Sequence, residues 1–100
     1  MPAKLILTWD INPEHEQDYF EFVVREFLPE VQKLGFNLSD AWVTVYGDQP
    51  QILVGATLPT AAAIRTIIES EPWSVLVDKL LAYVTDYKEK IVIESGGFQF

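Results

Sequence analysis

The segment AWVTVYGDQPQILVGATL, residues 41–58, decides the fold of this chain. It contains two runs that are rich in β-branched, aliphatic and aromatic residues, at positions 41–46 and 51–58. Between them lies GDQP, residues 47–50, which consists of residues that favour turns. The segment is therefore expected to form two strands joined by a tight connection, a β-hairpin.

One strand and one helix are predicted ahead of this hairpin. Residues 4–9 are apolar and β-rich, as expected of a short buried strand. Asn12 followed by Pro13 is typical of a helix start, because Asn caps free backbone N–H groups and Pro suits the first helical position. Gly35 is expected to end the helix, and Pro29 to bend it or to begin its final turn. Apolar residues at spacings of three and four predict the buried face of this helix: Phe20, Val23, Val24, Phe27, Val31 and Leu34.

A broken helix and a last strand are predicted after the hairpin. A helix is expected at residues 61–69, and the Ser-Glu-Pro sequence at residues 70–72 caps and restarts it at Trp73. This second part continues to about Leu81, and the last strand lies within residues 84–94. The resulting order is β-α-β-β-α-β. With right-handed crossovers, it places both helices on one face of a four-stranded antiparallel sheet, which is an α+β, ferredoxin-like fold.

Length and composition limit the classes to which the protein can belong. A chain of 100 residues, 49% hydrophobic and 13% aromatic, is expected to form one domain at residues 1–95, with residues 96–100 as a C-terminal tail. The lack of cysteine excludes disulfides and thiolate chemistry. Fifteen acidic and seven basic residues give a net charge of −8, which disfavours nucleic acid and anionic membranes as partners. No signal-like segment or long apolar run stands out, so a cytoplasmic location is expected.

The predicted strands carry apolar residues on both faces of the sheet, although the helices can cover only one. In the first strand, Leu7 and Trp9 alternate with Ile6, and in the third strand Val54 alternates with Leu53. Leaving an apolar face in water is unfavourable, so we expect a second copy to cover it, giving a homodimer through the helix-free face of the sheet. The alternative is that this face, rich in Thr, Ala and Gly, stays exposed.

Several features together resemble the dimeric α+β-barrel superfamily and its branch of antibiotic-biosynthesis-type monooxygenases. They are the order of the elements, the helix start Asn12-Pro13-Glu14, the Tyr19-Phe20 pair and the break at Ser70-x-Pro72-Trp73. The superfamily also contains haem-degrading monooxygenases, muconolactone isomerases and stress-responsive barrels. The resemblance implies two sheets packed into a barrel, with a pocket in each protomer between the sheet and the helices.

Neither a cofactor nor a metal is expected. The haem-degrading members use an Asn on the first strand and a haem-ligating His on the last helix. The chain has Thr8 and Trp9 on the first strand and no His after Trp73, so haem is not predicted. The acidic residues at 14–18 lack the spacing of a metal site.

Aromatic side chains are the candidate ligand-binding residues. Tyr46 would serve as a polar handle in a slot for a flat, apolar molecule. The full set is Trp9, Tyr19, Trp42, Tyr46 and Trp73. The alternative is that these aromatics simply fill the core.

His15 and Tyr46 are the candidate catalytic residues. His15 is the only histidine, and imidazole is the side chain that ordinarily titrates near neutrality. It could equally be an ordinary exposed residue in a first helical turn. Three functional classes follow: a homodimer that binds a small apolar or aromatic molecule, a cofactor-independent monooxygenase acting on a phenolic substrate, and an interaction protein with a filled pocket.

Overall fold

The computed structural model describes residues 2–43 and 52–93. Its four strands form one antiparallel sheet in the order β2-β3-β1-β4. The strands are β1 (Ala3–Ile11), β2 (Asn37–Val43), β3 (Ile52–Leu58) and β4 (Val84–Ile93). The helical segments are η1 (Pro13–His15), α1 (Glu16–Phe22), η2 (Val23–Phe27), α2 (Leu28–Lys33), α3 (Ala61–Ile68) and α4 (Glu71–Leu80).

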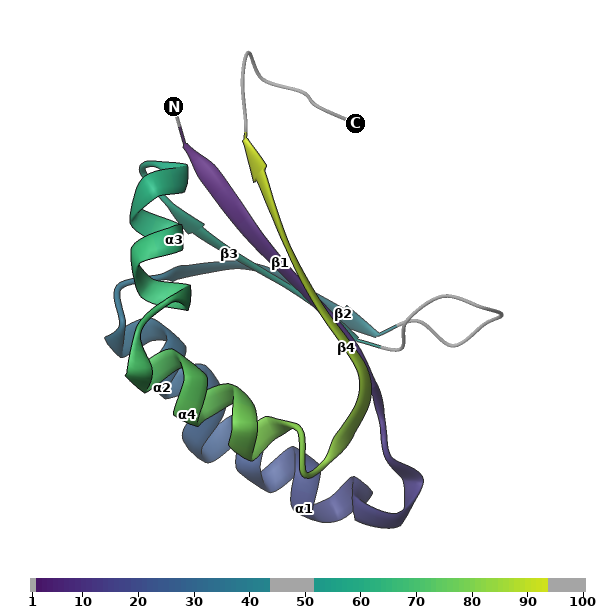
Figure 1. Cartoon of the computed structure of the whole chain (residues 1–100). Coiled ribbons are helices and arrows are strands. Elements are labelled where there is room, and N and C mark those ends of the chain that lie inside the picture. Colours follow the sequence, from purple (N-terminus) through teal and green to yellow (C-terminus); the bar gives the residue numbers. More distant parts are fainter. Residues whose placement is uncertain (1, 44–51, 94–100) are drawn as a thin grey trace.

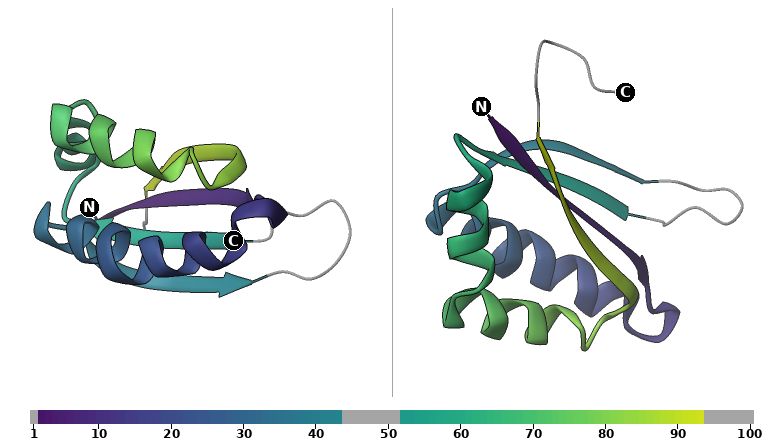
Figure 2. Two further views of the ribbon diagram at one scale, coloured as in Figure 1. Left: turned by 90° about the horizontal axis from the view of Figure 1, so that it is seen from below. Right: turned by 45° about the horizontal axis from the view of Figure 1, so that its top comes forward.

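This architecture confirms the predicted α+β, ferredoxin-like fold. All the helices lie on one side of the curved sheet, and the opposite side has none (Figure 1). Two further views show the same two-layer arrangement, with α4 running beside α1 and α2 (Figure 2). None of the helices in the described residues is long and apolar enough to cross a membrane.

The predicted hairpin is present as the antiparallel pair β2 and β3. The strand β2 begins at Asn37, earlier than the expected residue 41, because pairing of Asn37 with Thr57 extends the ladder toward the helix. The predicted turn at residues 47–50 lies outside the described residues, as does the predicted tail at 96–100.

The first helix begins as the sequence predicts. The side-chain Oδ1 of Asn12 accepts a hydrogen bond from the Glu14 backbone N–H at 3.1 Å, and Pro13 is the first helical residue. A 3-10 turn precedes the α-helical part, which starts at Glu16. The cap therefore satisfies one of the free donors at the helix start.

A π-helical turn, η2, interrupts this helix just ahead of Pro29. The backbone N–H of Leu28 donates to the carbonyl of Val23, five positions earlier. Pro29 has no N–H to donate to Arg25, four positions earlier, so the α-helical ladder cannot continue through this point. The final segment, α2, starts at Leu28, which agrees with the prediction that Pro29 opens the last turn.

The predicted buried face of this helix was wrong at two positions. Phe20 is 48% exposed and Val24 is 64% exposed, whereas Tyr19 is only 2% exposed. The buried residues Tyr19, Val23, Phe27 and Val31 repeat every four positions. In a regular α-helix residues four apart drift by about 40° around the axis. The wider π turn reduces this drift, so that one four-residue row stays on the sheet.

Gly35 ends the helix as predicted. Its φ is +115°, its N–H donates to the Gln32 carbonyl, and the Phe36 N–H donates to the Val31 carbonyl. This pair of bonds is the Schellman motif, which satisfies free carbonyls at the helix end.

The second helix is broken where expected, between α3 and α4. Thr60 caps α3 by accepting a hydrogen bond from the Ala63 N–H at 3.1 Å. Ser70 precedes α4, but its hydroxyl donates to the Ile67 carbonyl and does not cap α4. α4 begins at Glu71 and not at Trp73, because Pro72 fits within the first helical turn.

The core lies between the sheet and the helices. Alternate residues of β1, including Leu5, Leu7 and Trp9, are fully buried there, beside Val54 and Ala56 of β3. The other face of the sheet is called the helix-free face below. On β1 it consists of the residues that alternate with the buried ones, and on β3 and β4 it consists of their register partners. These residues are Lys4, Ile6, Thr8, Leu53, Gly55, Thr57, Lys88, Lys90 and Val92.

The helix-free face is apolar at its centre and basic along β4. Ile6 pairs with Gly55 on one side and with Lys90 on the other, and Thr8 pairs with Leu53 and Lys88. Ile6 and Leu53 are half-buried although no helix covers them. The apolar residues predicted on this face are thus confined to its centre, since Lys4, Thr8 and Thr57 of β1 and β3 are polar. β4 contributes two lysines to the same face.

Candidate ligand-binding groove

An open groove of about 330 Å³ lies between α4 and β4. α4 contributes one wall, and β4 contributes the other through Tyr87 and Glu89. The residues that line it are Ile68, Trp73, Ser74, Val77, Asp78, Tyr87 and Glu89. This volume is at the small end of the range for ligand pockets.

Tyr87 and Glu89 are joined by a hydrogen bond inside the groove. They are two positions apart in β4, so both side chains lie on the same side of the strand. The Tyr87 hydroxyl donates to Oε2 of Glu89 at 2.8 Å. Burial, together with this hydrogen bond to a carboxylate, raises the pKa of Tyr87 well above its ordinary value. The hydroxyl therefore remains a neutral donor at physiological pH.

Behind Tyr87, two further aromatic residues form a rigid support. The ring of Trp9 stacks on Tyr87, with ring centroids 6.2 Å apart and an interplanar angle of 19°. The indole Nε1–H of Trp9 donates to the Tyr19 hydroxyl oxygen at 2.8 Å. Burial raises the pKa of Tyr19, and the bond from Trp9 only partly opposes this shift. The row Tyr19–Trp9–Tyr87 connects the helix layer to the groove.

The predicted ligand-binding residues are not all brought together. Trp9 and Tyr19 are in contact in the core, and Trp73 lines the groove. In the sheet register, Trp42 of β2 pairs with Leu53 of β3, and Trp9 of β1 pairs with Ile52 of β3. The side chain of Trp42 lies outside the part of the chain that the structure describes. Tyr46 lies outside the described residues.

His15, the predicted catalytic residue, does not line the groove. It is exposed in η1, and its ring meets the ring of Tyr83 edge-on at 6.3 Å. Within residues 2–43 and 52–93, no group of three or more His, Asp and Glu side chains could hold a metal ion.

The sequence analysis missed Tyr87 and Glu89. Alternation in the YKEK segment at residues 87–90 places these two on one face and Lys88 and Lys90 on the other, and period-two reasoning could have found that. The proximity of Tyr87 to Trp9 could not be found in this way. The β1–β4 register shifts between Thr8 and Asp10, and Asp86 adopts a positive φ of 54° at this irregularity.

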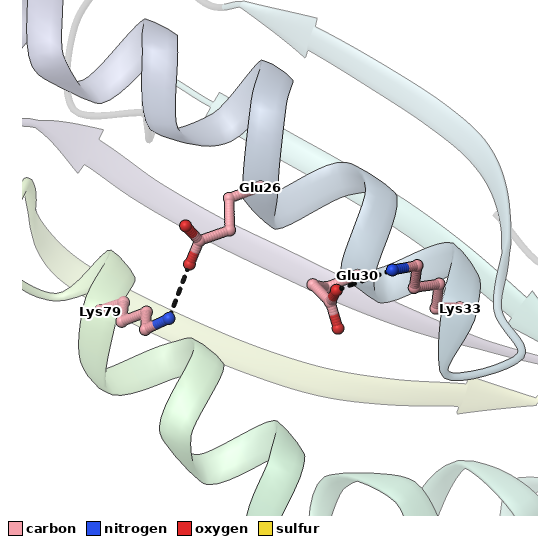
Figure 3. A network of polar contacts seen from close by, with 4 residues as sticks. All are labelled: Glu26, Glu30, Lys33 and Lys79. Atoms are coloured by element: carbon pink, nitrogen blue, oxygen red, sulfur yellow. Dashed lines mark hydrogen bonds and ion pairs between the residues drawn. The ribbon is translucent and has the colours of Figure 1, made fainter.

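A second groove, of about 710 Å³, separates η2 and α2 from α4. Glu26 and Lys79 form an ion pair across it at 2.8 Å, while Glu30 pairs with Lys33 on its own helix at 3.5 Å (Figure 3). The carboxylate of Glu26 raises the pKa of Lys79. Because these charges pair with one another, the groove is a contact between helices that is bridged by an ion pair.

Comparisons with known proteins were made for the sequence and for the fold. No protein-family model matches the sequence, and no curated protein does. Solved structures do match the fold. HapK from Hahella chejuensis has a TM-score of 0.75 at 10% identity, over 98% of this chain and 97% of its own.

Two further structures extend this likeness. A NIPSNAP family protein from Agrobacterium tumefaciens has a TM-score of 0.67 at 18% identity, over 94% of this chain and 86% of its own. A putative antibiotic biosynthesis monooxygenase from Nitrosomonas europaea has a TM-score of 0.63 at 14% identity, over 95% of this chain and 89% of its own. The chain therefore has the ferredoxin-like fold of NIPSNAP and antibiotic-biosynthesis-monooxygenase-like proteins. The resemblance in its sequence predicted this fold and the likeness to the antibiotic-biosynthesis monooxygenases, but not the likeness to NIPSNAP proteins.

Proposed function

We propose that the protein is a homodimer that binds a small apolar or aromatic molecule in the groove between α4 and β4. The observation that carries this proposal is that aromatic residues from both walls line the groove, Trp73 of α4 and Tyr87 of β4. Binding sites for small molecules combine apolar and aromatic walls with a few polar groups, and Ser74 and Glu89 supply such groups here.

The support behind Tyr87 favours binding. Its ring is held by stacking on Trp9, which is in turn held by Tyr19. A wall that is ordered before the ligand arrives costs little conformational entropy on binding. The groove is thus pre-organised for a flat ring.

Binding is tested by blocking the groove. Ser74 is exposed on α4 and lines the groove, so Ser74→Phe fills it without disturbing the core. The control is Val75→Phe, next along α4, where Val75 is 48% exposed and lines the other groove. In an NMR titration with indole, we expect shift changes at the amides of Ser74, Val77 and Tyr87 in the wild type and in the control. Shifts that persist in Ser74→Phe would place the indole elsewhere.

The dimer is proposed from the helix-free face. Ile6, Leu53 and Gly55 form an apolar centre that no helix covers. Burying apolar surface contributes about 25 cal/mol per Å², so a sheet face of this kind can drive association. A second copy is the proposed occupant, because the same face on both copies gives a closed two-fold contact.

Sedimentation velocity tests the dimer. Leu53→Glu puts a charge at the centre of the face, and we expect it to turn the wild-type dimer into a monomer at micromolar concentration. Val24→Glu adds the same charge at a 64% exposed site on the helix layer and should remain dimeric. Thermal unfolding followed by circular dichroism checks that each variant is folded, and Thr8→Glu repeats the test if Leu53→Glu is not. A monomeric wild type would refute the proposed dimer.

A second candidate function is cofactor-independent oxygenation of a phenolic substrate. The observation that favours it is the Glu89 carboxylate, held in the groove by Tyr87, which could accept a phenolic proton. The resulting phenolate would supply the electrons that reduce O₂, so that one oxygen atom enters the substrate and the other leaves as water.

Oxygen uptake with a panel of dihydroxy-aromatic compounds tests the enzyme function. We expect Glu89→Gln to lower the rate by about 10²-fold or more if Glu89 is the base. His15→Ala should leave the rate unchanged, since His15 does not line the groove. No uptake above the protein-free rate would reject this second function and would leave the binding proposal standing.

A further inference from the structure

We propose that the groove between α4 and β4 selects a positively charged aromatic molecule, an arylalkylamine, over neutral and anionic molecules of the same shape. This inference rests on the proposed binding function and adds the charge of the ligand to it. The juxtaposition that supports it is a carboxylate on each wall of the groove, Asp78 of α4 and Glu89 of β4, in a lining that also contains Trp73 and Tyr87.

The charges of the groove are of one sign. Its lining, as described, includes two acids and no Lys, Arg or His. The nearest basic residues along the chain are directed elsewhere. Lys79 is paired with Glu26 in the other groove, and Lys88 pairs with Thr8 on the helix-free face. An anionic ligand would therefore meet two carboxylates without a counter-charge.

Both carboxylates have oxygen atoms available to a ligand. Tyr87 donates to Oε2 of Glu89, and a carboxylate can accept several hydrogen bonds on its two oxygens. The side chain of Asp78 makes no hydrogen bond or ion pair with any residue in the described parts of the chain. An ammonium group has three donors, so it can engage acceptors on both walls.

The aromatic lining favours the same charge. Ammonium groups are attracted to the faces of Trp and Tyr rings, and this attraction grows where water is partly excluded. One face of the Tyr87 ring stacks on Trp9, and the ring also lines the groove. The ring of the ligand can pack on the half-buried Tyr87 while its ammonium group reaches a carboxylate.

Three probes of equal size separate charge from shape: phenethylamine, phenethyl alcohol and phenylacetate. Each is titrated into the ¹⁵N-labelled full chain at about 0.15 M ionic strength, where exposed charges are largely screened beyond about 8 Å. We expect the amine to bind about five- to tenfold more tightly than the alcohol, with shifts at Ser74, Tyr87 and Glu89, and the acid to bind most weakly.

Variants show whether the preference for the amine comes from the carboxylates of the groove or from the overall negative charge of the protein. Glu89→Gln keeps an oxygen that can accept the Tyr87 hydrogen bond, and Asp78→Asn keeps the side-chain shape. Each should reduce the preference for the amine over the alcohol by about threefold or more. Glu16→Gln removes one acidic charge from α1, outside the groove, and should leave the preference unchanged.

The outcomes separate this inference from the binding function. If amine and alcohol bind the groove equally, or if Glu16→Gln lowers the preference as much as Glu89→Gln, the charge selectivity is wrong and the groove still binds aromatics. If neither indole nor any of the three probes changes the chemical shifts of the groove amides, the binding function itself is refuted.

Discussion

Trp9 and Tyr19 are ten positions apart in the chain and share one buried hydrogen bond. Their ring centroids are 6.5 Å apart in an edge-on arrangement. Phe27 of η2 also meets Trp9 edge-on, with ring centroids 5.7 Å apart. The indole N–H of Trp9 is thus buried at little cost, because the Tyr19 hydroxyl oxygen accepts its hydrogen bond. This pair fixes the position of the ring against which Tyr87 stacks.

Replacing Tyr19 by Phe should lower the free energy of unfolding by about 1–3 kcal/mol, because the indole N–H of Trp9 would be buried without an acceptor. The measurement is urea unfolding followed by circular dichroism. Tyr83→Phe is the control, because the hydroxyl of the half-buried Tyr83 makes no hydrogen bond with the described residues. Its loss should change the free energy of unfolding by less than about 0.5 kcal/mol. Equal losses in the two variants would contradict a specific role for the Trp9–Tyr19 bond.

The raised pKa values of Tyr19 and Tyr87 predict how stability depends on alkaline pH. Both shifts favour the protonated hydroxyl in the folded state, so the folded protein keeps these protons to higher pH than the unfolded chain does. This contribution is fully present below about pH 10, the ordinary tyrosine value, and is lost as the pH rises above it. Urea unfolding at several pH values should show this loss. In Tyr87→Phe, the free energy of unfolding should fall less steeply with pH above about pH 10. An equally steep fall would refute the assignment of this loss to Tyr87.

At the scale of the element, the π turn η2 decides which side of the first helix meets the sheet. Val23 is 9% exposed and its neighbour Val24 is 64% exposed, although the spacing in the sequence groups both with the core. The turn coincides with the position where Pro29 removes a backbone donor. The missing donor of Pro29 thus accounts for the interruption of the α-helix, and packing against the sheet accounts for which row is buried.

Substituting each of these two valines by Asp tests the turn. Val23→Asp should destabilise the protein by at least about 2 kcal/mol, because a carboxylate would be placed against the core without a partner. Val24→Asp should change the free energy of unfolding by less than about 0.5 kcal/mol. Chemical denaturation of both variants measures this difference, and comparable losses would mean that the helix follows the regular α-helical register.

Gly35 offers a second prediction at this scale. A Cβ at this position would have ordinary space, since the nearest atom is Cδ1 of Ile67 at 3.9 Å, but φ is +115°. Gly35→Ala should therefore cost about 1–2 kcal/mol through backbone strain alone. Gly35→Asn should cost less, because Asn tolerates positive φ better than Ala does. Thermal unfolding of the two variants compares them, and a neutral Ala variant would disprove the strain.

At the scale of the whole molecule, an apolar centre and a large net charge act on association in opposite directions. Two protomers of −8 each would give an assembly of −16. The lysines of β4 lie at the border of the apolar centre of the helix-free face. Association through this face would thus be driven by burial and opposed by long-range repulsion.

Added salt should therefore strengthen the proposed dimer. Screening weakens the repulsion between the protomers, whereas burial of Ile6 and Leu53 is not weakened by sodium chloride. Sedimentation equilibrium between about 0.05 and 0.5 M salt should give a falling dissociation constant. A rising constant would mean that ion pairs across the contact, through Lys88 or Lys90, hold the dimer together.

Local chemistry in the sequence predicted the order of the elements and several of their ends. Asn12, Thr60 and Gly35 act through backbone groups only a few residues away, so their effects are visible in the sequence. The candidate site was only partly predictable. Trp73 was a candidate from the sequence and lines the groove, whereas the contribution of Tyr87 depends on a strand pairing with a shifted register.

By itself, the sequence determined the ferredoxin-like fold, because turn residues, caps and apolar spacing are short-range signals that agree with one another. Only the tertiary structure decided which helical row is buried and which aromatic residues meet. Both depend on the π turn at η2 and on the β1–β4 irregularity near Asp86, where a change of one position redirects every side chain beyond it. Such shifts are set by the packing of distant segments, and no local pattern encodes them.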